Sequence, residues 1–472
     1  MPASPAWRTP GAILLVSTYE LGHQPSGIAF PQAFLERAGF RPAALDLAVE
    51  PLDEARVRAA RLVLFSVPMH TALRLGLRAA ERVRTMNPSA ALAFHGLYAI
   101  LHAPLLRQAG AVAVLGGECE EDLVELARAL ERGPSPATGA RGEDPARFRS
   151  PAAAGAALRK LDFPVPSRAG LPPPDRYARL ADAEGRERLA GHSETTRGCK
   201  HLCRHCPIPA LYGGRFFAIP VEVVLEDVAR QVAAGVTHVT FGDPDFLNGP
   251  GHALRVTAAL HARFPSLTFD MTAKIEHLVR HARLLPALRE AGALFVVSAV
   301  ESLSDAVLAK LDKGHCRDDV LRAFAACAAA GLTLRPSLLP FTPWSTLDDY
   351  LDLLDTFARE GWLASLDPVQ LSIRLLVPPG SLLLDDPDLA AQGLDESALT
   401  YRWRHPDPRM DALQAKVART VEDAAARHEP TVVTFDRVRR LALAAAGRPH
   451  EHVVVAADTG KRAPRLTESW FC

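Results

Sequence analysis

Residues 195–207 read Thr-Thr-Arg-Gly-Cys-Lys-His-Leu-Cys-Arg-His-Cys-Pro, so Cys199, Cys203 and Cys206 are separated by three and then two residues. Three thiolates this close can ligate three irons of one cubic iron–sulfur cluster and leave the fourth iron open to a small chelating molecule. A ferredoxin-like cluster would normally need a fourth cysteine. Two other interpretations stay open: a zinc site with His201 or His205 as its fourth ligand, and three buried structural cysteines.

Alternating strands and helices surround this loop and predict a parallel barrel over residues 191–377. The expected strands are Glu194–Arg197, His238–Gly242, Thr268–Thr272, Leu294–Ala299, Thr333–Leu338 and Val369–Leu376. The expected helices are Val221–Ala234, His252–Arg263, Ala282–Ala291, Ser304–Leu311, Val320–Ala330 and Asp348–Arg359. Six such units fit a partial (β/α)6 barrel, in which the chemistry lies at the C-terminal ends of the strands. The cysteine loop follows the first strand.

The first segment, residues 10–132, predicts a separate α/β domain with a doubly wound parallel sheet. Its expected strands are Ala12–Ser17, Leu62–Val67, Ala91–His95 and Ala111–Leu115, with helices at Phe30–Ala38 and Leu73–Val83. Residues 133–190 are expected to form a linker and a crossing segment, because they begin with a Gly, Pro and Ser cluster. Residues 378–472 are expected to form a mostly helical extension, with one helix at Met410–Ala426, and a polar tail that ends in cysteine.

Composition excludes several classes of protein. The chain has 472 residues, 48% of them hydrophobic, which is enough for about three domains with a large core. A formal net charge of zero gives no sign of a nucleic-acid or anionic membrane partner. We see neither a signal peptide nor an apolar run long enough to span a membrane, and so expect a cytoplasmic location. Thiols stay reduced there, so the seven cysteines indicate metal or redox chemistry rather than disulfides.

The cysteine loop, placed after a first barrel strand, resembles that of the radical S-adenosylmethionine (SAM) superfamily over about residues 191–377. The resemblance implies that Cys199, Cys203 and Cys206 hold a 4Fe–4S cluster whose open iron chelates the amino and carboxylate groups of SAM. One electron from the cluster would then break a C–S bond of SAM and yield a 5′-deoxyadenosyl radical. The protein would place that radical against one substrate hydrogen and exclude water. His205 takes a position that is often aromatic in the superfamily, so we expect it to shield the cofactor.

A second resemblance lies in the turn Gly242-Asp243-Pro244-Asp245-Phe246, after the second expected strand. It falls where the superfamily carries a Gly-Gly-Glu-Pro-like turn that receives the amino group of SAM. Asp243 is the first candidate for this contact and Asp245 the second, because a carboxylate accepts charge-assisted hydrogen bonds from an ammonium group. The alternative is an ordinary turn aspartate before proline.

Three further side chains are candidates for cofactor binding at the barrel mouth. Glu301, followed by Ser302, resembles an acid–Ser pair of superfamily members that carry a cobalamin domain. Lys274 ends the third expected strand and Arg335 lies in the fifth, and either could contact a carboxylate or ribose. The alternative for each is a salt bridge at the barrel rim.

The N-terminal domain resembles the cobalamin-binding domains fused to radical enzymes, through residues 65–70 and 116–118. The usual Asp-x-His-x-x-Gly motif is missing, although His23 follows the first strand. Either cobalamin binds without a histidine below the cobalt, or the domain keeps its fold without the cofactor.

These features predict an enzyme that starts radical chemistry, with cobalamin-assisted methyl transfer as one form of it. The alternative is an iron–sulfur and cobalamin sensor or binding protein without turnover. An enzyme of this kind needs a reductant such as flavodoxin or ferredoxin. The substrate, a small molecule or a peptide, cannot be read from the sequence.

The last residue, Cys472, is a candidate catalytic thiol. The tail resembles a small family of radical enzymes with a cobalamin-like domain whose C-terminus reads Cys-Cys-Ala-Glu-Pro or Cys-selenocysteine-Ala-Glu-Pro. Selenocysteine is encoded by UGA, which routine gene prediction reads as a stop. The resemblance therefore implies a truncated selenoprotein in which Cys472 would have a vicinal selenol partner for redox cycling. The alternative is a free surface thiol at a true terminus.

Overall fold

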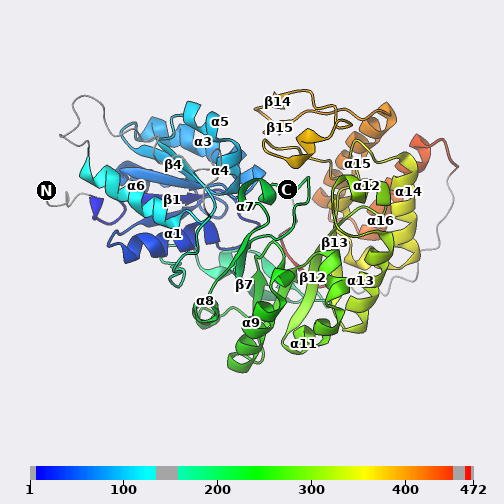
Figure 1. Cartoon of the computed structure of the whole chain (residues 1–472), viewed down its shortest axis with the longest axis horizontal. Coiled ribbons are helices and arrows are strands. Elements are labelled where there is room, and N and C mark those ends of the chain that lie inside the picture. The colour runs from blue at the N-terminus through cyan, green and yellow to red at the C-terminus, as the bar shows by residue number, and fades with distance from the viewer. Residues whose placement is uncertain (1–6, 134–157, 450–462, 469–472) are drawn as a thin grey trace.

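Two largely parallel sheets organise the chain, and a helical region packs against the second (Figure 1). The computed structural model describes residues 7–133, 158–449 and 463–468. The expected α/β architecture, with a doubly wound domain, a partial barrel and a helical extension, is confirmed.

The N-terminal sheet is fully parallel and has the strand order β2-β1-β3-β4-β5. Its strands are β1 (Ile13–Ser17), β2 (Ala43–Asp46), β3 (Leu62–Ser66), β4 (Ala91–His95) and β5 (Ala113–Leu115). Its helices are α1 (Ser26–Arg37), α2 (Glu54–Ala59), α3 (His70–Met86), α4 (Leu97–Leu101), α5 (Ala103–Gln108) and α6 (Glu120–Arg132). Alternate residues of β1 enter two different cores: Ile13 and Leu15 pack with α1 and α6, and Leu14 and Val16 with α3. Helices therefore cover both faces, which explains the continuous apolar strands.

The barrel sheet has the order β13-β12-β11-β10-β7-β6-β16. Its parallel strands are β7 (Glu187–Ser193), β10 (His238–Phe241), β11 (Thr268–Thr272), β12 (Ala293–Glu301) and β13 (Thr333–Leu338), while β6 (Arg179–Ala181) and β16 (Arg465–Leu466) are antiparallel additions. The helices are α8 (Val221–Ala233), α9 (Pro250–Arg263), α10 (Ile275–Arg280), α11 (Leu285–Glu290), α12 (Asp305–Lys310), α13 (Arg317–Ala329) and α14 (Leu347–Arg359).

Two expected barrel strands differ from the structure. The first strand is β7, which ends at Ser193, so the range Glu194–Arg197 falls instead in a turn and in β8 (Thr196–Gly198), which pairs with β9 (Phe216–Ala218). The barrel sheet therefore begins before residue 191. The sixth strand, Val369–Leu376, is reduced to one bridge between Phe341 and Arg374, because Pro368–Leu371 forms a 3-10 turn capped by the Asp367 side chain.

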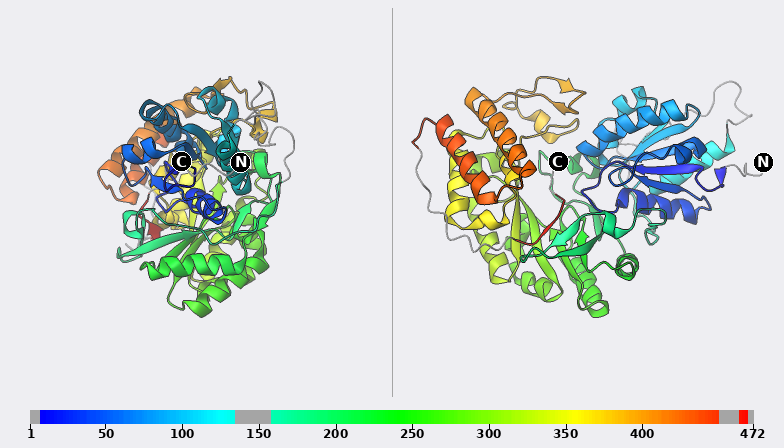
Figure 2. Two further views of the ribbon diagram at one scale, coloured as in Figure 1. Left: turned by 90° about the vertical axis from the view of Figure 1, so that its left-hand side faces the viewer. Right: turned by 180° about the vertical axis from the view of Figure 1, so that it is seen from behind.

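The C-terminal region brings the chain back to the barrel sheet. A small ribbon of β14 (Leu394–Asp395) and β15 (Thr400–Tyr401) precedes the helices α15 (Pro408–Ala426) and α16 (Thr431–Ala445). Strand β16 then pairs with β6, and the Arg335 side chain of β13 donates a hydrogen bond to the Pro464 carbonyl at 3.4 Å. In the right-hand view of Figure 2 this segment, drawn in red, lies beside the strands of the barrel sheet. It therefore connects opposite edges of the open barrel. Along the described residues, no helix has the length and apolar character needed to cross a bilayer.

Candidate functional site

The cysteine loop leaves β8 through a turn that only glycine can form. Gly198 has φ +75°, and a Cβ there would lie 2.5 Å from the carbonyl oxygen of Arg215, the residue before the paired strand β9. Cys199 and Cys203 are buried and Cys206 is half-buried, and all three are free thiols. Helix α7 (Ile208–Tyr212) begins directly after the loop.

The three thiols lie near enough to one another for their charges to interact. Burial raises the pKa of the Cys206 thiol to about 12, and the neighbouring Cys203 and Cys199 charges raise it further. Burial is also the main cause that raises the pKa of Cys199. Thiolates form in such a place when a bound cation compensates their charge, as the irons of a cluster would. Free, buried and mutually close thiols therefore fit a cluster.

A buried ion pair lies beside the cysteines, and one of its partners was missed in the sequence. Lys313 donates from Nζ to Glu301 Oε1 at 3.1 Å, and His205 Nε2 lies 3.3 Å from the same oxygen. Burial acts to lower the pKa of Lys313, but the charges of Glu301 and Cys203 raise it on balance. Burial opposes the charge of Glu301, yet Lys313 and His205 lower the pKa of Glu301 to about 2. The structure thus brings the predicted residues His205 and Glu301 together. It also places the charged Lys313 ammonium beside the cysteine loop.

Asp243 accepts hydrogen bonds from the residues that lead into the cysteine loop. Its Oδ1 accepts from the Thr195 amide at 2.7 Å, and its Oδ2 accepts from the hydroxyls of Thr195 and Thr196 at 2.6 Å each. Burial raises the pKa of Asp243 to about 6, although these hydrogen bonds act against the rise. Both oxygens are therefore engaged within the protein, and contact with SAM stays a prediction for Asp243.

The remaining candidate residues divide into two places. Asp245 is fully buried beside His201 and His277, and Lys274 Nζ lies 3.6 Å from Glu276 Oε2 in the same neighbourhood. Arg335 instead contacts the C-terminal segment at Pro464. Cys472 lies outside the described residues.

Arg197, two residues before Cys199, joins the barrel to the N-terminal domain. Its guanidinium bonds to Glu120 and lies 3.4 Å from Glu118, both near the C-terminal edge of the N-terminal sheet, and its Nε donates to Glu194 at 2.9 Å. Burial raises the pKa of Glu118 to about 7, although the positive charge of Arg197 acts to lower it. The buried Arg197 side chain therefore links the start of the cysteine loop to the edge of the N-terminal sheet.

A cavity of about 390 Å³ lies between that sheet edge and the barrel. Ser66, His95, Gly96 and Gly117 from the ends of β3, β4 and β5 form one side. His95 is buried, its Nε2 has no hydrogen-bond partner among the described residues, and burial lowers its pKa to about 4. His70, by contrast, contacts the Ala398 carbonyl at 2.8 Å. An orphaned imidazole nitrogen at the ligand edge of a parallel sheet fits a flat cofactor such as cobalamin.

A second cavity, of about 290 Å³, occupies the barrel interior. Residues of β7, β10, β11, β12 and β13 line it, together with Leu466 and Glu468 of the C-terminal segment and with His23. His23 stacks on His192 with ring centroids 3.5 Å apart, and burial lowers the pKa of His23 to about 3. Burial also lowers the pKa of His192, so both rings are neutral side chains that line the cavity.

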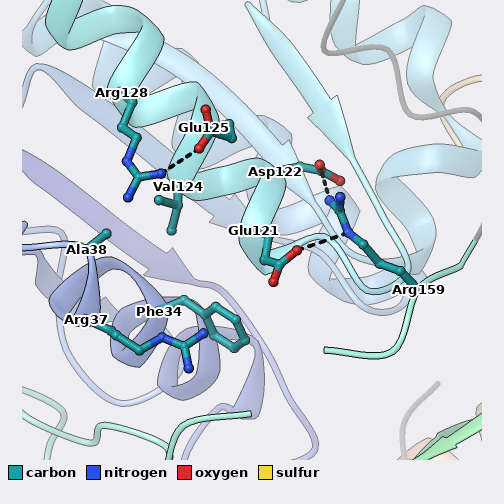
Figure 3. Close-up of a pocket in the computed structure, with 9 residues that line it drawn as sticks. All are labelled: Phe34, Arg37, Ala38, Glu121, Asp122, Val124, Glu125, Arg128 and Arg159. Carbon is teal, nitrogen blue, oxygen red and sulfur yellow. Dashed lines mark hydrogen bonds and ion pairs between the residues drawn. The ribbon is translucent and has the colours of Figure 1, made fainter. Parts of the chain in front are cut away.

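A third hollow lies between α1 and α6, on the outer face of the N-terminal domain (Figure 3). Charged side chains line it, and Arg159 pairs there with Glu121 and Asp122 and Arg128 with Glu125. It contains none of the residues predicted for the site.

Comparison with known proteins identifies the class. Residues 193–355 match the sequence profile of the radical SAM superfamily, a range that runs from the end of β7 through the cysteine loop and into α14. This segment is therefore similar to the radical SAM enzymes, for which a 4Fe–4S cluster and SAM are the typical cofactors. A protein of Methanocaldococcus jannaschii with the provisional name methylthiotransferase is 25% identical over 244 residues, or 48% of this chain and 50% of that relative. The chain thus spans about half the length of this curated relative.

Two solved structures are similar to most of this chain in fold. The cobalamin-dependent radical enzyme OxsB, with aqua-cobalamin and SAM bound, matches with a TM-score of 0.65 at 14% identity, over 87% of this chain and 66% of that one. The radical SAM methyltransferase TsrM of Kitasatospora setae, with tryptophan and a SAM analogue bound, matches with a TM-score of 0.59 at 17% identity, over 89% of this chain and 90% of that one. At these identities the likeness concerns the fold.

Proposed function

We propose that the chain holds a 4Fe–4S cluster on Cys199, Cys203 and Cys206 and cleaves SAM reductively to start radical chemistry on an organic substrate. The observation that carries this proposal is the group of three free, mutually close thiols at the open end of the barrel, beside the buried ion pair of Lys313 and Glu301. When bound, the cluster supplies the electron that breaks a C–S bond of SAM. Lys313 and His205 hold Glu301 ionised at this place.

We further propose that cobalamin binds at the edge of the N-terminal sheet and assists methyl transfer. The cavity beside His95, the unpartnered Nε2 and the shared fold with two cobalamin-binding enzymes support this. Gly96, which lines the cavity, allows a close approach of two chain segments at its edge, since a Cβ there would lie 3.0 Å from the Val67 backbone. Retention of hydroxocobalamin by the full chain after gel filtration tests the proposal, and elution without it would favour a fold kept without its cofactor.

We also propose that Cys472, which lies outside the described residues, acts as a redox thiol. Substitution Cys472→Ser should then stop turnover while cluster and SAM binding persist. The resemblance to the selenocysteine-tailed family is tested by the coding DNA. A UGA codon after codon 472, followed in frame by Ala-Glu-Pro codons, supports it, and a UAA or UAG codon contradicts it.

The central experiment is anaerobic reconstitution followed by reduction with dithionite, or with flavodoxin or ferredoxin as the proposed partner. We expect about four irons per chain, a broad sulfide-to-iron band that bleaches on reduction, and release of 5′-deoxyadenosine or S-adenosylhomocysteine from SAM. Cys203→Ala should abolish the band, and Cys327→Ala, a buried thiol outside the loop, is the matched control. Zinc in the cysteine site without the band would overturn the proposal. A stable cluster without either product would favour a sensor.

A further inference from the structure

The side chains of His201, Asp245 and His277 form a second group of metal-ligating residues, next to the cysteines but separate from them. One ligand atom from each lies within 4.8 Å of the others. His201 comes from the cysteine loop, Asp245 from the turn after β10, and His277 from α10. Asp245 and His277 are buried, whereas the His201 side chain is 17% exposed and leaves a path for a small ion.

The contact between His277 and Asp245 is not a formed hydrogen bond. His277 Nδ1 lies 2.6 Å from Asp245 Oδ2, yet neither atom has a hydrogen-bond partner among the described residues. Either a proton on the imidazole or a bound cation would stabilise two polar atoms this close. A proton would require Nδ1 to point at the oxygen, whereas a metal ion lets both atoms point at a third position. The orphaned pair therefore indicates a cation site.

Neighbouring groups contact the Asp245 and His201 side chains and help to orient them. Asp245 Oδ1 accepts from the Leu247 amide at 3.2 Å, which leaves Oδ2 directed at the histidines. His201 Nε2 lies 3.6 Å from Asp245 Oδ2 and 3.3 Å from His277 Nε2. His201 Nδ1 lies 3.6 Å from Glu276 Oε2, on the opposite side of its ring. A carboxylate behind a ligating histidine is the arrangement that commonly orients imidazoles at metal centres.

We propose that His201, Asp245 and His277 bind one divalent transition-metal ion of the zinc or ferrous class. Two imidazoles and one carboxylate match the donor preference of these ions, and three protein ligands leave a position open for water or another ligand. The ion would tie the cysteine loop to α10. It would also balance the buried charge of Asp245, which now acts to raise the pKa of the Cys199 thiol. This gives Asp245 a role other than contact with SAM.

The test counts two metals in the same sample of full-length protein. Anaerobically reconstituted chain is dialysed against micromolar Zn²⁺, and iron and zinc are measured by mass spectrometry. We expect about one zinc in addition to the cluster iron. Asp245→Asn and His277→Ala should weaken zinc binding at least about tenfold with the iron content unchanged. Asp245→Asn keeps the oxygen that accepts from Leu247, so it is the variant least able to disturb the fold.

His281→Ala is the matched control, because its ring centroid lies 5.6 Å from that of His277 but the residue does not belong to the group. Zinc should raise the melting temperature of wild type and His281→Ala, and not that of Asp245→Asn. Equal zinc retention by wild type and Asp245→Asn would overturn the proposal, as would zinc that replaces iron one for one. Wild-type protein that binds zinc but no iron would contradict the cluster assignment and leave this proposal intact. The two proposals therefore fail separately.

Discussion

Replacing Lys313 by methionine tests whether the cluster loop depends on one buried ion pair. The substitution keeps much of the side-chain volume and removes the ammonium that lies 3.1 Å from Glu301 Oε1. Glu301 would then be a buried carboxylate with only His205, among the described residues, within hydrogen-bond reach. Such a charge must either take up a proton or remain uncompensated.

The magnitude follows from the titration of Glu301. Its pKa is about 2 instead of the ordinary 4.5, and this difference is worth about 3 kcal/mol of folding stability at neutral pH. Because the folded-state pKa is lowered, that stability is present above about pH 4.5 and is lost as the pH falls towards 2. Breaking a buried pair by removing one partner typically costs about 3–5 kcal/mol, which agrees with this figure.

The assay is urea unfolding of cluster-free protein at pH 7 and pH 5, followed by tryptophan fluorescence. We expect Lys313→Met to unfold at lower urea with an unchanged slope, and to lose less stability at pH 5, where the unpaired Glu301 takes up a proton more readily. The double variant Lys313→Met with Glu301→Gln removes both charges and should regain at least about 2 kcal/mol over the single variant. A double variant as unstable as Lys313→Met alone would refute the reasoning.

Three further substitutions give independent tests. Asp243→Asn should lower the free energy of unfolding by about 1–3 kcal/mol, because the donors on Thr195 and its neighbour lose an anionic acceptor; unchanged stability with weaker SAM binding in calorimetry would favour direct SAM contact. Arg197→Leu should cost about 3–5 kcal/mol and speed proteolysis between the two domains, since Glu120 loses its cation; equal protease resistance would argue against this coupling. Burial and a nearby glutamate raise the pKa of Glu20 to about 8, so wild-type stability should fall as pH rises from 4.5 through 8. Glu20→Gln should flatten that slope in melting curves, and an unaltered slope would exclude Glu20 as its source.

The fold could be predicted wherever strands are short apolar runs between amphipathic helices. Strands β1, β3 and β4 fall within a residue or two of their expected ranges because they are buried on both faces. Strand β2 was missed because Ala-Ala-Leu-Asp is too short to show a period. Strand β7 was misplaced because its sequence, Glu-Arg-Leu-Ala-Gly-His-Ser, carries polar residues, and His192 among them lines the barrel cavity.

The candidate site could be predicted only where its residues are close in sequence. The spacing of the cysteines identified the loop by itself, and the structure adds that His205 meets Glu301. The contacts of Lys313, of His277 with His201, and of Arg197 with Glu118 could not be predicted. The last two join residues 76 and 79 positions apart, and periodicity carries no information on which distant charges meet.

The placement of Arg197 limits how this enzyme can be rebuilt from parts. The side chain lies over the Phe30 ring, with its guanidinium carbon 4.4 Å from the ring centroid, and it bonds to Glu120 while belonging to the strand that leads into the cysteine loop. An N-terminal domain grafted from another protein would leave this cation facing foreign side chains, only two residues from Cys199. A functional chimera therefore needs acidic side chains on the grafted domain at the positions of Glu118 and Glu120. For the same reason, the two domains are expected to change together in evolution.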